Sequence, residues 1–175
     1  VEEMGFGVDI FKYFAFNDPD WDYSKYDFST WAKDTRMTAS TLNAVSTDLS
    51  AFHARGGKLI IWHGWADAAL TALATIDYYK KLLENNPAAK DYTRLYLIGG
   101  CGHCGGGPGV SNVDWLEVIS DWVENDQAPD MIIATKPAKS DAPAMTRPLS
   151  PYPKKTVYKG TGDPNSAESF QSVQP

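Results

Sequence analysis

Residues 99–109 read GGCGHCGGGPG and set a histidine between two cysteines at the centre of a glycine-rich stretch. Glycine loses more backbone freedom on ordering than any other residue, so the stretch is predicted to be a loop. Residues 93–98, just before it, are typical of a strand, and the residues from Ser111 onward are typical of a helix. A tight loop between a strand and a helix is a position where folds present a catalytic base, here His103.

A second strand with a similar ending precedes this loop. Residues 58–62, KLIIW, form a short apolar run typical of a buried strand, and HGWAD follows at 63–67. A helix with one apolar face is expected over residues 76–83, and Pro87 marks its end. The order strand, loop, helix, strand, loop, helix predicts an α/β fold with a parallel sheet.

The other segments give weaker patterns. Residues 1–36 are predicted to be irregular, and residues 37–54 favour one or two short helices. From Ala128 the chain is predicted to be extended and proline-rich, wrapping a surface. The second helix is expected to start at Ser111. Its predicted inner face consists of Trp115, Leu116, Ile119, Trp122 and Val123.

Composition excludes several classes of function. The 175 residues carry 22 acidic and 16 basic side chains, and the resulting net charge of -6 argues against nucleic acid or an anionic membrane as the main partner. No apolar run approaches the roughly 18 residues of a membrane span. The two cysteines are too few for a disulfide scaffold.

Asp67 and His103 are the main candidate pair. Each follows a predicted strand, and neighbouring parallel strands end at one edge of a sheet, where ligands bind in such folds. An aspartate that accepts the Nδ1 proton of a histidine, leaving the other nitrogen to deprotonate a nucleophile, is the charge pair of a hydrolase. The alternative is that Asp67 caps a turn and His103 is an ordinary loop residue. The residues alone leave both interpretations open.

His63 and Trp65 border the same turn. We expect His63 to pack there, with a smaller role in holding the Asp67 loop, and Trp65 to line the pocket.

Three other interpretations of the glycine-rich stretch are disfavoured. Cys101 and Cys104 have the spacing of a redox dithiol, but glycines follow, and a helix cannot start there to lower a thiol pKa. Zinc ligation by Cys101, His103 and Cys104 would crowd the metal, and no second cysteine pair completes a site. A phosphate-binding loop would need a Lys-Ser/Thr that is absent. We expect no metal site in this chain.

The chain resembles the tannase and feruloyl esterase family of α/β-hydrolases, almost continuously from Phe11 to Phe170. The blocks that carry the resemblance occur in order along the chain: FKYFAFNDPDWD (11–22), GGKLIIWHGWAD (56–67), IDYYKKLL (76–83), GHCGGGPG (102–109), DWLEVISDWVENDQAPD (114–130) and TRPLSPYPKKTVYKGTGDPN (146–165).

The resemblance implies a secreted or periplasmic esterase that cleaves phenolic-acid esters, such as feruloyl sugars or galloyl esters. Asp67 matches the acid of the family's triad and His103 matches its base. The family's disulfide from the residue after the base to a cysteine directly before the nucleophilic serine implies that Cys104 is bridged outside this chain. Residues 1–43 would be the end of an inserted lid and its return to the core, and 44–175 the C-terminal part of the catalytic domain.

The chain departs from the family in what it lacks. No G-x-S-x-G serine elbow occurs, and no serine follows a cysteine. We therefore expect the serine and most of the lid, which in this family often binds calcium, in an N-terminal part that precedes Val1. Ser150 stands where relatives often have cysteine, and Cys101 where they often have a hydrophobic residue.

The expected partners are therefore a small phenolic ester and the N-terminal part of the enzyme, with no cofactor in this chain. Alone, the chain is expected to be inactive. The alternative function is a non-catalytic remnant of the same fold that binds phenolics or glycans.

Overall fold

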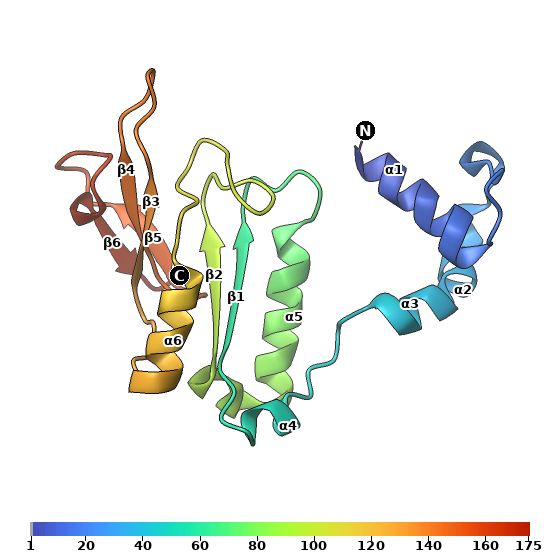
Figure 1. Cartoon of the computed structure of the whole chain (residues 1–175), viewed down its shortest axis with the longest axis horizontal. Coiled ribbons are helices and arrows are strands. Elements are labelled where there is room, and N and C mark those ends of the chain that lie inside the picture. The colour runs from blue at the N-terminus through green and yellow to red at the C-terminus, as the bar shows by residue number, and fades with distance from the viewer. Residues whose placement is uncertain (1) are drawn as a thin grey trace. The chain divides into compact units, whose positions relative to one another are not determined.

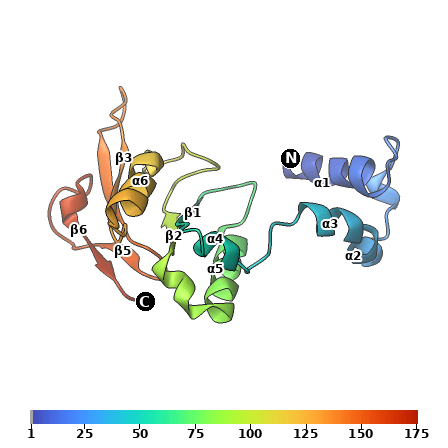
Figure 2. The same ribbon diagram turned by 60° about the horizontal axis from the view of Figure 1, so that its bottom comes forward.

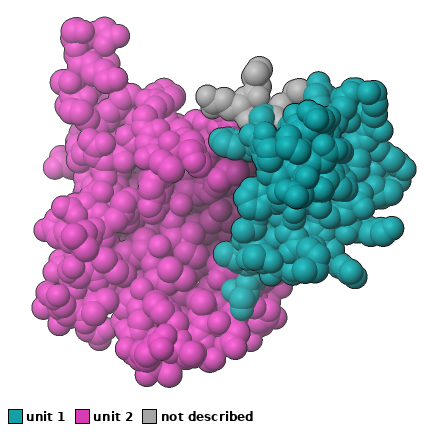
Figure 3. All heavy atoms as spheres, turned by 45° about the vertical axis from the view of Figure 1, so that its right-hand side comes forward, with its two compact units in different colours: residues 1–46 teal, residues 47–175 magenta. Residues whose placement is uncertain are grey.

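The computed structural model describes residues 2–175, with side chains from Gly5 onward, and the chain divides into two compact units (Figure 3). The first comprises residues 1–46 and the second residues 47–175, a boundary close to the one expected after residue 43. The identity of the first unit as the end of a lid stays a prediction. No helix in the described part of the chain combines the length and apolar character needed to cross a membrane.

The first unit is largely helical, so the prediction of an irregular segment was wrong. Gly5 and Gly7 lower the helix propensity that a sequence pattern reveals. An aromatic cluster orders the segment instead: the Phe11 ring stacks on Trp21 at 5.0 Å and meets Tyr26 at 4.9 Å between ring centroids. The elements of this unit are α1 (Glu2–Asp9), the π-helix η1 (Ile10–Ala15), the 3-10 helices η2 (Tyr23–Lys25) and η3 (Phe28–Thr30), α2 (Trp31–Asp34) and α3 (Arg36–Leu42).

The second unit is built on two parallel strands, β1 (Leu59–Gly64) and β2 (Thr93–Ile98), as predicted. Their register runs from Leu59 opposite Thr93 to Gly64 opposite Ile98, so both strands end at the same edge. The helix α4 (Ser50–His53) precedes β1, and α5 (Ala72–Asn85) with the 3-10 helix η4 (Pro87–Asp91) connects the strands (Figure 1). With α3, helix α4 confirms the short helices expected over residues 37–54.

Helix α5 begins and ends on signals that the sequence contains. The Thr71 hydroxyl accepts a hydrogen bond from the Leu73 N–H and caps the first turn. Asn86, directly before Pro87, ends the helix, and its side chain accepts from the Ala88 N–H to start η4.

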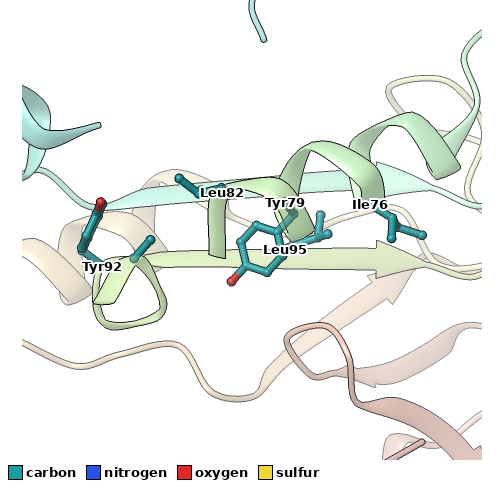
Figure 4. Packing of buried hydrophobic residues seen from close by; sticks show 6 residues of the cluster. Ile76, Tyr79, Leu82, Tyr92 and Leu95 are labelled. Carbon is teal, nitrogen blue, oxygen red and sulfur yellow. The ribbon is translucent and has the colours of Figure 1, made fainter. Parts of the chain in front are cut away.

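One face of the parallel pair is covered by α5. Ile76, Tyr79 and Leu82 recur at helical spacing and form a buried cluster with Tyr92 and Leu95 (Figure 4). Leu82 and Leu95 are fully buried, which fixes this helix against the sheet that carries the site.

The opposite face is covered by α6 (Trp115–Asn125), and Figure 2 shows the two helices on either side of the strands. The ring of Trp115 stacks on Trp62 at 5.7 Å between centroids. Trp122 is buried, and the Arg94 guanidinium lies 4.9 Å from its ring.

Helix α6 starts four residues later than the sequence predicts. Asp114, not Ser111, caps it by accepting from the Glu117 N–H at 3.0 Å. The Ser111 N–H is instead bonded to the Thr135 carbonyl, which draws this segment into an extended bridge. Tertiary pairing therefore overrides the serine capping signal.

The predicted inner face of α6 was wrong at two positions. Leu116 is 74% exposed and Val123 is 55% exposed, whereas Trp122 is 1% exposed. The helix meets the sheet through a narrow stripe that includes Trp115 and Trp122, and the residue after each of these lies about 100° further round the helix.

The C-terminal segment is extended as predicted, but much of it pairs into strands, which the prediction of a surface wrap did not include. Its prolines lie partly in turns: Lys154 N–H donates to the Pro151 carbonyl between two strands. Both pairs are antiparallel. They are β3 (Ile132–Lys136) with β4 (Met145–Leu149), and β5 (Lys155–Tyr158) with β6 (Phe170–Val173), which follows the 3-10 helix η5 (Ala167–Ser169).

Candidate active site

The loops that follow β1 and β2 are tied together by backbone hydrogen bonds. Trp65 N–H donates to the Ile98 carbonyl, and Ala66 N–H donates to the Cys101 carbonyl, both at 2.9 Å. A Cβ on Gly64 would lie 2.3 Å from the Cys101 oxygen, so only glycine allows this approach. The end of the parallel pair thus brings the Asp67 loop against the glycine-rich loop.

Asp67 and His103 meet at this edge. The His103 Nδ1 lies 2.7 Å from the Asp67 Oδ2. The other carboxylate oxygen, Oδ1, accepts from the N–H groups of Ala69 and Leu70, both at 2.9 Å. The Asp67 side chain is 4% exposed and that of His103 is 52% exposed, so a buried acid holds a histidine that faces outward.

These contacts keep the Asp67 carboxylate ionised and decide which ring nitrogen of His103 donates to it. The Leu70 N–H, followed by the hydrogen bond from His103, holds the pKa of Asp67 well below its usual range, against the opposing effect of burial. An ionised carboxylate only accepts hydrogen bonds, so Nδ1 carries the proton and Nε2 of the neutral ring is an acceptor. No described residue forms a hydrogen bond to that Nε2.

His63 is a second imidazole at the same carboxylate. Its Nε2 lies 3.3 Å from the Asp67 Oδ2 and 3.1 Å from the Leu70 carbonyl, and its Nδ1 lies 2.8 Å from the Thr75 Oγ1. Because both neighbours of Nε2 are acceptors, Nε2 must carry a proton. His63 therefore links β1, the Asp67 loop and α5 through polar contacts, where the sequence favoured simple packing.

Thr75 was not among the site residues expected from the sequence. Its hydroxyl reaches His63 from the first turn of α5, a contact that exists only after the helix has docked on the sheet. The hydrogen bonds from the backbone N–H groups after Asp67 could have been predicted from the sequence, because aspartate commonly accepts from the N–H two residues further on.

Trp65, the other pocket candidate, is 48% exposed. It lines a cavity of about 430 Å³ together with residues of β2, β4 and the segment after β4. Neither Asp67 nor His103 lines that cavity.

The glycine-rich loop is closed by its own backbone and by one lysine. A Cβ on Gly107 would lie 2.3 Å from the Gly100 oxygen, and its φ of +85° favours glycine. The Lys136 ammonium donates to the carbonyls of Gly107 and Pro108, both at 2.9 Å. Lys136 was not expected at this loop from the sequence, because it lies on β3, 28 residues further along the chain than Pro108.

The two cysteines differ in environment, and neither forms a disulfide with a described residue. Cys101 is fully buried, and burial, followed by the charge of Asp67, raises the pKa of its thiol. Cys104 is exposed, directly follows His103 and has a φ of 55°. The next helix after them is α6, so no helix N-terminus activates Cys101. This environment disfavours a redox dithiol.

Within the described residues, no group of three or more His, Cys, Asp or Glu side chains is arranged to hold a metal ion. The calcium site expected in the lid of an N-terminal part stays a prediction.

Comparisons with known proteins place most of the chain in one family. Residues 4–173 match the family described as tannase and feruloyl esterase. The chain is 44% identical over 161 residues to the mono(2-hydroxyethyl) terephthalate hydrolase of Piscinibacter sakaiensis, with 86% of the chain and 27% of that protein covered. It is 29% identical over 177 residues to feruloyl esterase B of Aspergillus niger, with 89% of the chain and 34% of that protein covered.

The fold agrees with a solved structure as well. The chain superimposes on the crystal structure of an esterase from Aspergillus oryzae with a TM-score of 0.85 and 26% identity, covering 96% of the chain and 37% of that protein. The chain thus spans about a third of the length of the proteins it matches. The motif resemblance is confirmed, and the chain belongs to the tannase and feruloyl esterase family.

Proposed function

We propose that the protein hydrolyses carboxylic esters of phenolic acids through an acyl-enzyme, with His103 as general base and Asp67 as the acid that orients it. The observation that carries this proposal is the 2.7 Å contact between His103 Nδ1 and a buried Asp67 carboxylate, with His103 Nε2 free toward the surface. That geometry is what a base for a nucleophilic hydroxyl requires.

The proposed reaction has two halves. A serine hydroxyl gives its proton to His103 Nε2 while its Oγ attacks the ester carbonyl, and the Asp67 carboxylate stabilises the imidazolium that forms. His103 then gives the proton to the departing alcohol, which leaves an acyl-serine. Water, deprotonated by His103, attacks that acyl group, and the proton returns to the serine as the aromatic acid leaves.

The proposed serine lies outside these 175 residues, in an N-terminal part of the polypeptide. Within residues 5–175 no serine hydroxyl forms a hydrogen bond with His103, which supports this assignment. We propose that Cys104 holds the two parts together by a disulfide to a cysteine beside that serine. Its exposure next to His103 supports this choice over the buried Cys101.

The substrate class and the location are part of the same proposal. Two of the relatives are named for esters of aromatic acids, a feruloyl group and a terephthalate. A disulfide at Cys104 would persist only in an oxidising compartment, so the proposal includes secretion or export to a periplasm.

The test is an assay of the full-length gene product on methyl ferulate, methyl gallate and mono(2-hydroxyethyl) terephthalate. We expect turnover of at least one ester and its loss in His103→Ala by about four to six orders of magnitude in kcat. His53→Ala is the matched control, because His53 is exposed and stacks on Tyr92, 4.0 Å between ring centroids. Ordinary turnover by His103→Ala contradicts the proposal, and binding of the esters with no turnover by the wild type would favour the non-catalytic alternative.

A further inference from the structure

A cavity of about 430 Å³ lies beside β2 in the second unit, and the proposed hydrolysis does not use it. Trp65 lines it from the loop after β1, and Leu97 lines it from β2. Arg147 of β4 and Phe170 of β6 contribute further wall. Its volume is within the range of small-molecule sites.

The charge of this cavity is opposite to that of the chain. Arg147, Lys154 and Lys155 line it, and no aspartate or glutamate does, although the chain has a net charge of -6. None of the three cations forms an ion pair with a described residue. Such an arrangement favours an anionic ligand.

The Arg147 guanidinium is held in a fixed plane. It lies 4.2 Å over the Phe170 ring, and its Nη1 donates to the Thr146 carbonyl at 2.7 Å. Partial burial lowers the pKa of Arg147, and the negative charge of Asp163 raises it. Asp163 is too far away to form an ion pair with Arg147. A guanidinium carries five N–H donors in a rigid fork, so donors remain for a carboxylate.

The other walls suit a flat apolar group. Trp65 is 48% exposed, and Leu97 adds an aliphatic surface beside it. Aromatic side chains and aliphatic surface bind planar rings by burying apolar area. A ligand that matches both the walls and the cations carries a ring and a negative charge.

We propose that this cavity binds an aromatic carboxylate, with the carboxylate on Arg147 and the ring against Trp65. Lys154 and Lys155 add positive potential at its rim. A neutral ester lacks the charge that the guanidinium recognises, so the cavity favours a free acid over its ester. The site is independent of the Asp67–His103 pair and does not require that the pair be catalytic.

The test measures binding to the full-length gene product by titration calorimetry, with ferulate as the probe, in a His103→Ala background so that no probe ester is consumed. Methyl ferulate is the uncharged comparison, and inorganic phosphate is the anion without a ring. We expect ferulate to bind at least about tenfold more tightly than either.

Variants assign the binding to this cavity. Arg147→Gln is expected to weaken ferulate binding by about tenfold or more, and Trp65→Ala by a smaller factor. Lys80→Gln, which removes an exposed lysine on α5 outside the cavity, is the matched control and should bind like the parent. Should Arg147→Gln fail to fold, the exposed pair Lys154→Gln/Lys155→Gln still has to weaken ferulate binding and leave methyl ferulate unchanged.

Three results would overturn the proposal. They are equal affinity for ferulate and methyl ferulate, phosphate binding as tight as ferulate binding, and ferulate affinity that none of the cavity variants changes. None of them bears on the proposed hydrolysis, which is measured by turnover, so failure of one proposal is distinguishable from failure of the other.

Discussion

The Asp67 loop and the glycine-rich loop meet at one edge of the sheet but differ in how many of their polar groups have partners. The Asp67 carboxylate has two backbone N–H donors and two imidazoles within this chain and is 4% exposed. Among the described residues, the His103 ring has Asp67 as its one hydrogen-bond partner and is 52% exposed, and Cys104 beside it is exposed as well.

The difference indicates that the two residues of the proposed site are held in place to different degrees. The acid is fixed by the chain itself, because every contact to its carboxylate comes from residues 63–103. The proposed base, His103, is held by the described residues through Nδ1, and its ring is half exposed.

After the loss expected for His103→Ala, the next largest effect is expected at Asp67, whose carboxylate has partners at both oxygens. Asp67→Asn preserves the shape of the acid but removes the charge that requires a proton on His103 Nδ1, so we expect kcat to fall by about 10⁴. Steady-state kinetics of the full-length protein on methyl ferulate measure it. An unchanged kcat, with only the stability of the protein lowered, would mean that Asp67 does no more than cap its turn.

Replacement of Cys104 tests whether a disulfide holds His103 in place. If a disulfide positions His103 beside the serine, Cys104→Ser should lower kcat by about 10- to 100-fold, because small displacements of a catalytic group are costly. Peptide mapping without reduction should find Cys104 joined to a cysteine outside residues 1–175 and Cys101 as a thiol. A Cys101–Cys104 bridge, or a free Cys104 thiol in the active protein, contradicts this prediction.

His63 tests whether the acid depends on its second imidazole. His63→Ala should lower kcat by about tenfold through a less well-oriented Asp67, with KM little changed. His63→Gln retains an N–H donor and should recover part of that loss in kcat. If His63 only packs, His63→Ala and His63→Gln should have similar kcat values. His53→Ala again serves as the control, and wild-type kcat in His63→Ala would remove His63 from the network.

The smallest expected effect is a pH dependence of the free energy of unfolding. The pKa of Asp67 is lowered in the folded protein from its ordinary 3.8. Ionisation of Asp67 therefore stabilises the folded protein, and this contribution is complete above pH 3.8, the pKa of the unfolded state. The contribution is lost as the pH falls through the lower pKa of the folded state. The unfolding free energy of wild type should exceed that of Asp67→Asn at pH 6, and the gap should narrow below pH 4. A gap that widens with acid would reverse the sign of the argument.

The sequence predicted the parts of the fold that are encoded locally. The strand at 93–98, the helix that ends before Pro87 and the loop containing His103 all have their glycine, proline or apolar periodicity within a few residues. The approach of Asp67 to His103 also followed, because neighbouring parallel strands end at one edge.

Features that depend on distant pairing could not be predicted. The strands after Ala128 are defined by partners such as Leu149 opposite Ile132, and the sequence pattern suggested only an extended chain. Ser111 is a good capping residue in isolation, but its backbone is bonded to Thr135 and the helix begins later. The cavity joins Trp65 to Arg147, which no local pattern relates.

The central claim is that this chain supplies the acid and the base to a serine outside residues 1–175, and active-site labelling tests it most directly. The full-length protein is treated with a fluorophosphonate, which phosphorylates an activated serine, and the labelled peptide is sequenced by mass spectrometry. We expect one labelled serine outside residues 1–175 in the wild type and no labelling at a comparable rate in His103→Ala. A label on a serine within residues 1–175, or an unchanged labelling rate in His103→Ala, would contradict it.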